Sequence, residues 1–247
     1  MKEIDDKKYI LDTIHNLSNN KNTHSVFSDV VICCAYALAN ASNFSQERED
    51  RFNRIIKSYG NQGVTQFASI LAHLFNNYSN KRGSDILGEV YEELKLSNGN
   101  FGQFFTPLNV CNLMSEITLD KDDTEKELKN QGFISISDPA CGSGRLLYSS
   151  YLTLLDRGVN SNDILLVGDD VDLLCSCMTY IQLSLTGASA IVNHKDTLTG
   201  EVYDTFYTPS FASNAKLQEK VFKQKGVDVE IWVIYIKMSL KKLIMLI

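Results

Sequence analysis

The sequence has no excess of positive charge and no apolar run at its start. Its 24 Lys and Arg residues face 30 Asp and Glu residues, which gives a net charge of -6. Contact with nucleic acid is therefore expected from a local patch or a partner rather than from a basic surface. The first six residues lack the apolar stretch of a signal peptide, and lysines interrupt the apolar stretch 231–247. We expect a cytoplasmic protein that does not enter a membrane.

Cysteine occurs six times but never with the Cys-x-x-Cys spacing of a metal site. Cys175 and Cys177 lie two residues apart in a stretch with helical spacing, so their side chains point to different sides. None of the four histidines is near them in the sequence. This pattern argues against structural zinc and indicates reduced thiols.

Proline is also scarce, with three residues in 247. Pro107 follows Thr106 as a cap and first-turn pair for a helix at 108–117. Pro139 cannot donate to a sheet ladder and so ends the strand before it. The apolar fraction of 44% and the charged fraction of 22% are ordinary for a globular protein of one or two domains.

The order of the expected elements predicts two different parts. The first hundred residues favour helices at 30–38 after Ser28 and Asp29, at 43–56, at 64–75, and at 86–96 after Ser84 and Asp85. A polar stretch at 120–131 is a solvated linker or helix. Strands at 133–137, 164–168 and 189–193 then alternate with helices at 145–157 and 172–185, which predicts βαβ units and a parallel sheet. We expect an all-α domain at 1–98 and an incomplete α/β domain at 99–247.

The segment 134–147 reads I-S-I-S-D-P-A-C-G-S-G-R-L-L and places a small-residue loop at the carboxyl end of a strand. Gly142 and Gly144 let the backbone turn and come close to a ligand. Leu147 stands where a dinucleotide fold has its third glycine, and Asp138 precedes the loop where a phosphate binder avoids negative charge. An acid here suits a cationic ligand such as S-adenosylmethionine (SAM), although a tight turn in an unrelated α/β protein remains an alternative.

Two motifs together resemble a known family. G-Q-F-F-T-P at 102–107 stands about thirty residues before D-P-A-C-G-S-G at 138–144. This combination is similar to the modification subunits of type I restriction systems, which are SAM-dependent adenine-N6 DNA methyltransferases. The resemblance implies a Rossmann-like methyltransferase sheet, here truncated, with SAM as cofactor, DNA as substrate, and specificity and restriction subunits as partners. The acidic chain alone is expected to bind DNA weakly.

The resemblance also implies cofactor-binding positions. These are Gln103, Phe104, Phe105, Thr106, Pro107 and Leu108 as a lid, then Asp138, Cys141, Gly142, Ser143 and Gly144 in the loop, and Asp170 and Asp196 after the next two strands. Thr106 would donate to the methionine carboxylate, Asp170 would accept from the ribose hydroxyls, and Asp196 from the adenine amine. A helix cap at Thr106, solvated helix-start acids at Asp169 and Asp172, and a loop-capping Asp196 are the alternatives.

The family's catalytic signature, Asn/Asp-Pro-Pro-Tyr/Phe, is absent because no two prolines are adjacent. The nearest match is Thr208-Pro209-Ser210-Phe211, after an aromatic-Asp start at 203–204. Here Pro209 would keep the carbonyl and Phe211 the stacking ring, but Thr208 has a hydroxyl in place of an amide or carboxylate. An ordinary polar turn is the alternative.

Three functions are consistent with these features. The first is a SAM-dependent adenine-N6 DNA methyltransferase, whether active, truncated or inactive. The second is a catalytically dead paralogue that binds only SAM or partner subunits, as the altered tetrapeptide suggests. The third is a methyltransferase for RNA or protein amide nitrogen, against which the G-Q-F-F-T-P segment and the helical front part argue.

Overall fold

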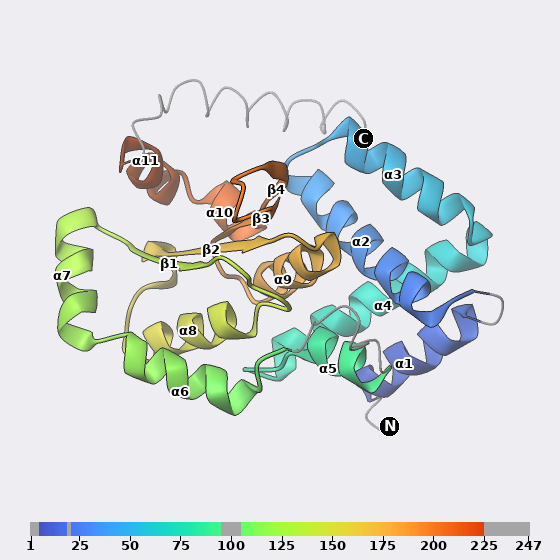
Figure 1. Cartoon of the computed structure of the whole chain (residues 1–247), viewed down its shortest axis with the longest axis horizontal. Coiled ribbons are helices and arrows are strands. Elements are labelled where there is room, and N and C mark those ends of the chain that lie inside the picture. Colours follow the sequence, from blue (N-terminus) through green and yellow to red (C-terminus); the bar gives the residue numbers. More distant parts are fainter. Residues whose placement is uncertain (1–4, 19–20, 95–104, 225–247) are drawn as a thin grey trace.

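The computed structural model describes residues 5–18, 21–94 and 105–224 (Figure 1). The helices are α1 (Asp6–Leu17), α2 (Thr23–Ser42), α3 (Gln46–Lys57), α4 (Gly60–Asn80), α5 (Ile86–Glu93), α6 (Leu108–Thr118), α7 (Lys121–Gln131), α8 (Arg145–Asp156), α9 (Leu173–Leu185), α10 (Pro209–Ser213) and α11 (Ala215–Gln224), with a short 3-10 helix η1 (Ser161–Asp163). The strands are β1 (Ile134–Asp138), β2 (Ile164–Asp170), β3 (Ala190–Lys195) and β4 (Val202–Tyr207). The α/β fold class expected from the sequence is confirmed, with helices first and a sheet after them.

Each helix predicted in the helical part is present, but α1 was not predicted, and α2 and α4 begin at Thr23 and Gly60, earlier than the expected 30 and 64. α2 begins at Thr23 because Asn22 caps it, accepting hydrogen bonds from the backbone of His24 and Ser25. The predicted start at Ser28 and Asp29 is wrong, since a cap residue such as Asp29 is tolerated inside a helix when packing holds the helix. Residues 121–131 form α7, so the polar stretch is a helix and not an irregular linker.

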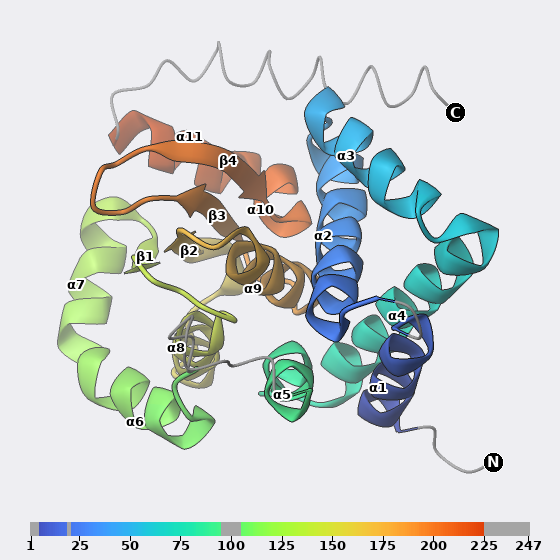
Figure 2. The same ribbon diagram turned by 45° about the vertical axis from the view of Figure 1, so that its right-hand side comes forward.

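Helix α2 is long and apolar enough to span a membrane by length and composition. It packs instead against α9, α3 and α4 (Figure 2), and 61% of its apolar window is buried inside the protein. Residues such as Val26, Ala35 and Ala39 are almost fully covered by these neighbours. Helix α2 is therefore the central helix of a core that continues into the sheet through Tyr180 and Phe206.

The sheet has the order β1-β2-β3-β4. β1, β2 and β3 are parallel, with Ile136 beside Leu166 and Gly168 beside Val192. Their crossover helices α8 and α9 pack on the sheet, as in half of a doubly wound fold. The loop after β1 contacts the start of α5 through Ser143 and Asp85, and the carboxyl ends of β2 and β3 lie near α3, where Leu173 and His194 line a cavity with Arg48, whereas the loop after β3 is exposed. This placement is what positions the site.

The fourth strand departs from the expected topology. β4 runs antiparallel to β3, with Val192 beside Phe206 and His194 beside Asp204. In a doubly wound sheet the fourth strand instead pairs in parallel with the other edge of the first strand. No strand among the described residues covers that edge of β1. The Rossmann-like sheet is incomplete, and its fourth strand pairs with β3, on the opposite side from the fourth strand of a doubly wound sheet.

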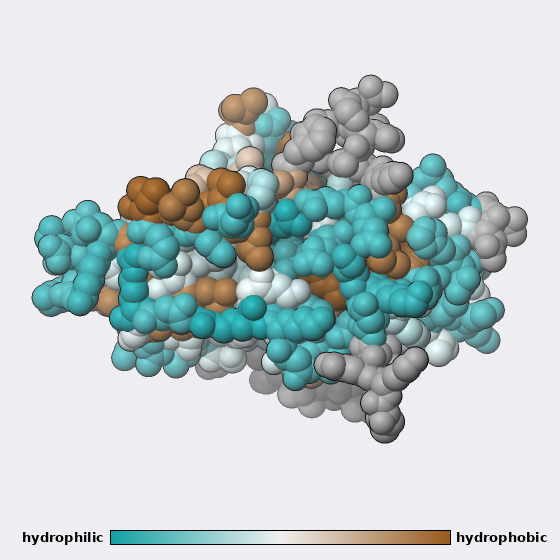
Figure 3. Space-filling model, turned by 90° about the horizontal axis from the view of Figure 1, so that it is seen from below, coloured by the Kyte–Doolittle hydropathy of each residue, from teal (hydrophilic) through white to brown (hydrophobic). Residues whose placement is uncertain are grey.

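Apolar side chains remain uncovered on α6. Val110, Leu113, Met114 and Ile117 are 39–73% exposed and recur with helical spacing on one side of the helix. Figure 3 shows apolar atoms gathered at the left of the underside, where Figure 1 places α6. The other side of α6 packs on α8, which holds the helix against the α/β part.

Candidate SAM-binding loop

The loop between β1 and α8 depends on two glycines with left-handed backbone. Gly142 has φ 56° and Gly144 has φ 89°, a region that residues with a Cβ rarely adopt. Space is restricted as well, because a Cβ on Gly144 would lie 3.0 Å from Thr179 Oγ1 and one on Gly142 would lie 3.2 Å from Phe105 Cδ1. Thr179 also donates to the Gly142 carbonyl at 2.9 Å. The loop is thus held close to α9 and to the segment before α6.

Two carboxylates border this loop. Asp170, at the end of β2, accepts hydrogen bonds from the backbone N–H of Gly142 at 2.9 Å and of Asp172 at 2.9 Å. Asp138, at the end of β1, accepts from the backbone of Ala140 at 3.0 Å. Burial raises the pKa of Asp170; the two backbone donors oppose that shift and the charge on Asp138 adds to it. The carboxyl edge of the sheet therefore has negative potential, which favours a cationic ligand.

A buried ion-pair network anchors the loop to the helical part. Arg145 donates through Nε to Asp85 Oδ2 and through Nη1 to Glu92 at 2.9 Å. Ser143 donates to the same Asp85 oxygen at 2.8 Å, and Gly88 donates its N–H to the other oxygen at 3.1 Å. Burial raises the pKa of Asp85, and the charge of Arg145 opposes the shift. The network fixes the start of α8 relative to α5.

The sequence reasoning found only part of this network. Asp85 was expected as the cap of α5, which it is, but its pairing with Arg145 sixty residues away has no local signal. Ser143 was expected to bind cofactor, yet its hydroxyl is buried and directed at Asp85. The Cys141 side chain is also buried, between Thr179 and the β2 backbone at Gly168. Only the backbone of these two residues is left to reach a ligand.

The lid residues lie partly in the described chain. Gln103 and Phe104 fall outside the described residues. Phe105 packs on Tyr91 with ring centroids 5.1 Å apart and contacts the loop near Gly142, so it joins the helical part to the loop. Thr106 is exposed. Pro107, not Thr106, occupies the cap position of α6, and among the described residues no side chain caps that helix. Leu108 is the first residue of α6.

The loop after β3 meets the loop after β1. Thr197 Oγ1 donates to the Pro139 carbonyl at 2.8 Å, which brings the two turns together. Asp196 caps its own turn by accepting from the backbone of Leu198 and Thr199, and these bonds lower its pKa. One oxygen of Asp196 is thus used in the turn, as the loop-capping alternative requires.

The other acids of this edge have structural partners. Asp169 is buried and pairs with Lys195 Nζ at 2.6 Å and with the Asn193 amide at 2.6 Å. Asp172 caps α9 by accepting from the backbone of Leu174 at 2.7 Å. All six cysteines are buried and unpaired, and no group of three potential metal ligands occurs among the residues described.

The residues expected to be catalytic lie elsewhere. Thr208 follows the antiparallel β4 at the amino end of β3, so the structure places the expected catalytic residues Thr208, Pro209 and Phe211 at the opposite end of the sheet from the cofactor loop. The Thr208 hydroxyl is buried, donates to the Ala188 carbonyl at 2.8 Å and accepts from the Ala190 N–H at 2.8 Å. Phe211 is fully buried, packed with the apolar residues under α11, and Pro209 starts α10. The tetrapeptide is a helix cap, close to the polar-turn alternative.

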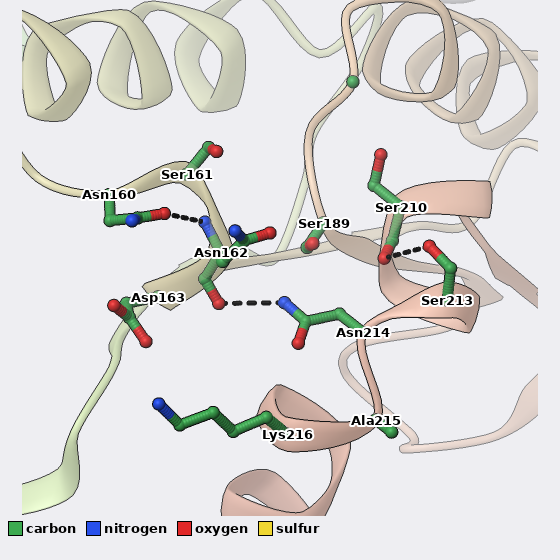
Figure 4. A pocket seen from close by; sticks show the side chains of 11 residues that line it. Asn160, Ser161, Asn162, Asp163, Ser189, Ser210, Ser213, Asn214, Ala215 and Lys216 are labelled. Atoms are coloured by element: carbon green, nitrogen blue, oxygen red, sulfur yellow. Dashed lines mark hydrogen bonds between the residues drawn. The ribbon is translucent and has the colours of Figure 1, made fainter.

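A polar cavity of about 530 Å³ lies at this amino end of the sheet (Figure 4). Ser210 and Ser213 line it from α10, and Asn214 donates to the Asn162 carbonyl at 2.9 Å across it. It is bordered by the segments that enter β2 and β3, whereas Asp138 and Asp170 are at the strands' other ends. This cavity is therefore separate from the candidate SAM-binding loop.

Comparison with known proteins agrees with the loop motif. A family described as N-6 DNA methylase matches residues 82–217. The type I restriction enzyme MjaVIII methylase subunit of Methanocaldococcus jannaschii is 30% identical over 155 residues, covering 58% of this chain and 23% of that protein. The MjaIX methylase subunit of the same organism is 26% identical over 136 residues, covering 51% of this chain and 22% of that protein. The chain thus spans less than a quarter of the curated relatives it matches.

A solved Listeria monocytogenes structure, assigned to the class I S-adenosylmethionine-dependent methyltransferases, overlaps 87% of this chain and 70% of its own. It is 13% identical, with a TM-score of 0.40. The family match instead covers more than half of the chain and includes Asp85, Arg145, Asp170 and the glycine loop. On this basis the protein belongs to the N-6 DNA methylase family.

Proposed function

We propose that this chain is the SAM-binding part of an adenine-N6 DNA methyltransferase of the type I modification kind. The observation that carries the proposal is the loop from Asp138 to Gly144, with two left-handed glycines and with Asp170 holding the Gly142 N–H. Family membership and the relatives named as methylase subunits support the same reaction class.

The residues at the carboxyl edge fit the chemistry of SAM. Its ammonium and sulfonium groups are cationic, and one oxygen of Asp138 has no hydrogen-bond partner among the described residues. Asp170 keeps lone pairs free beyond its two backbone donors and lies at the strand end where ribose hydroxyls are bound in nucleotide folds. Exposed Thr106 is the candidate donor to the methionine carboxylate. Asp196 retains one oxygen for the adenine amine.

Each of these groups has a defined task in that reaction. When bound, SAM supplies a methyl group on a sulfonium, which an adenine amine attacks directly. Asp138 and Asp170 orient the cofactor, and Phe105 shields the loop from water on the side of Tyr91. Because the Thr208 hydroxyl is buried and hydrogen-bonded at the other end of the sheet, the groups that orient the adenine come from residues other than this tetrapeptide.

Binding of SAM can be measured by isothermal titration calorimetry. Asp170→Ala is expected to weaken binding by roughly 1–3 kcal/mol, since it leaves polar ligand groups without an acceptor. Asp122→Ala is the matched control, because Asp122 is an exposed acid at the start of α7. No SAM binding by the folded wild-type chain, or equal loss in both variants, would contradict the proposal.

A second candidate function, a SAM-binding protein without methyltransferase activity of its own, is favoured by the placement of Thr208. Tritium transfer from labelled SAM into adenine-containing DNA separates the two. We expect background transfer from the chain alone, and Thr208→Asn with Ser210→Pro should not raise it. Methyl transfer well above background by the unmodified chain would show that this chain contains the catalytic groups and would refute the second function.

We further propose that DNA recognition depends on partner subunits of the specificity and restriction kind, and that the protein acts in the cytoplasm. The net charge of -6 disfavours contact with DNA over most of the surface. Titration of duplex DNA at physiological salt should show weak, sequence-independent binding. Tight binding to one sequence by the chain alone would contradict a dependence on partners.

A further inference from the structure

A second cavity, of about 300 Å³, lies between α3 and the β3–β4 hairpin. Its lining includes Arg48, Arg51 and Arg54 from α3, and His194 and Tyr203 from the hairpin. It is at the same end of the sheet as the candidate SAM-binding loop, because His194 lies beside Asp170 in the β2–β3 register. None of the described residues assigned above to SAM lines it.

Arg48 is buried without enough partners. Only 4% of the residue is exposed, and its Nη2 donates to the Asn43 carbonyl at 2.8 Å. Its Nε and Nη1 are buried and make no hydrogen bond with any residue that the structure describes. The nearest carboxylate, Asp204 Oδ1, is 3.9 Å from Nη1, too far for a hydrogen bond. Leaving donors of a buried cation unsatisfied is costly, so this guanidinium favours an additional anionic acceptor.

Two more arginines face the same space. Arg51 and Arg54 follow Arg48 at intervals of three, which places all three on one side of α3. Both line the cavity, and neither makes an ion pair or hydrogen bond with the residues the structure describes. Two acids, Glu47 and Asp204, also line it, so three guanidinium groups face two carboxyl groups.

Asp204, the carboxyl group nearest to Arg48, does not satisfy the free Arg48 donors. Burial raises the pKa of Asp204 and the charge of Arg48 opposes that shift. Asp204 also has a local donor, the N–H of Thr205 at 2.8 Å, so it does not depend on Arg48 for a hydrogen bond. The Arg48 donors therefore remain available to a ligand in the cavity.

We propose that this cavity binds a phosphate group, held by Arg48, Arg51 and Arg54. Planar guanidinium groups bind phosphate oxygens through paired hydrogen bonds, which lysine cannot do. The phosphate belongs either to a nucleotide, as a phosphomonoester, or to the backbone of DNA, as a phosphodiester. The inference does not rest on the proposed function, since the cavity shares no residue with the candidate SAM-binding loop.

The test uses the full chain and three probes. Inorganic phosphate and AMP are titrated by calorimetry, and a short fluorescent DNA duplex by anisotropy. Arg51→Gln and Arg54→Gln are expected to weaken binding about tenfold or more each, as loss of a charge-assisted hydrogen bond predicts. Lys57→Gln is the matched control, because Lys57 is an exposed cation of the same helix outside the cavity. It should change binding less than about twofold.

The probes distinguish the source of the phosphate. Arginine-dependent binding of AMP and phosphate without an arginine effect on DNA assigns the site to a nucleotide. An arginine effect on DNA affinity assigns it to the DNA backbone. Absence of binding by all three probes, or equal losses in Lys57→Gln and Arg51→Gln, would overturn the phosphate site. SAM titration of the same variants should be unchanged, so failure of this site and failure of SAM binding are separate results.

Discussion

Removing the charge of Asp85 should destabilise the protein far more than removing the charge of an exposed acid. The Asp85 and Arg145 side chains are 3% and 9% exposed, so Asp85→Asn leaves a buried guanidinium without its main counter-charge. The loss expected for breaking a buried pair is about 3–5 kcal/mol. For a chain of this size that lowers Tm by roughly 6–20 °C. Asparagine keeps the size of the side chain and an oxygen for the Gly88 N–H. Its amide group replaces the Oδ2 atom that accepts from Ser143 and Arg145, so the variant removes the charge together with these two hydrogen bonds.

The matched control is Asp156→Asn. Asp156 pairs with Arg82 at 2.5 Å, but the two side chains are 61% and 58% exposed. An exposed pair contributes about 0–1 kcal/mol, so Tm should fall by less than about 4 °C. The assay is thermal unfolding followed by far-UV circular dichroism, with urea unfolding as a second measurement.

A double variant tests whether the loss comes from an uncompensated charge. Asp85→Asn with Arg145→Gln should be more stable than the sum of the two single losses predicts, because it leaves no buried ion alone. SAM affinity should fall in Asp85→Asn, since Ser143 and Arg145 no longer fix the loop. Equal Tm values for Asp85→Asn and Asp156→Asn would refute the argument that this network anchors the loop.

Four further outcomes follow from the geometry. Gly144→Ala should lower the free energy of unfolding in urea by more than Gly158→Ala does. Both glycines have positive φ, but of the two only Gly144 would place its new Cβ against another side chain. Equal losses of stability would show that the contact with Thr179 is absent. Thr208→Val should lower the free energy of unfolding by about 1–3 kcal/mol, because the buried hydrogen bonds of the Thr208 hydroxyl are lost. SAM affinity measured by calorimetry should not change, and loss of SAM binding by the folded variant would place Thr208 at the cofactor. The pKa of Asp170 is raised in the folded protein, so the unfolded chain releases this proton at a lower pH, and the contribution of Asp170 to stability falls as pH rises from about 3.8 through the raised pKa. Asp170→Asn should therefore reduce the pH dependence of the urea unfolding midpoint over this pH range, and an unchanged pH dependence would contradict the shift. Burial raises the pKa of all six cysteine thiols above the ordinary value of 9.0, least clearly for Cys111 and well above it for the other five. A thiol reagent at neutral pH should therefore label the protein only after denaturant is added, and rapid labelling of the native chain would contradict the burial of these thiols.

Local patterns in the sequence determined most of the secondary structure and the position of the cofactor loop. The strand before Pro139, the two glycines and the helix from Arg145 are set by neighbouring residues, because proline, glycine and helical spacing act over a few positions. The family motif and the acids after each parallel strand could be found in the same way. The assignment of individual residues to SAM remains a prediction.

Tertiary structure decided the long-range contacts and the strand pairing, which local sequence patterns do not encode. The partners of Ser143 and Arg145 include Asp85, about sixty residues earlier, and a contact at that separation has no periodic signature. The direction of β4 depended on whether residues 202–207 pair with β3 or with β1, and an alternating pattern is the same for either edge and either direction. That pairing moved Thr208 to the amino end of the sheet, away from the loop. It also closed the β3–β4 hairpin over α3, so that three arginines spaced along one helix meet a cavity that their sequence alone does not reveal.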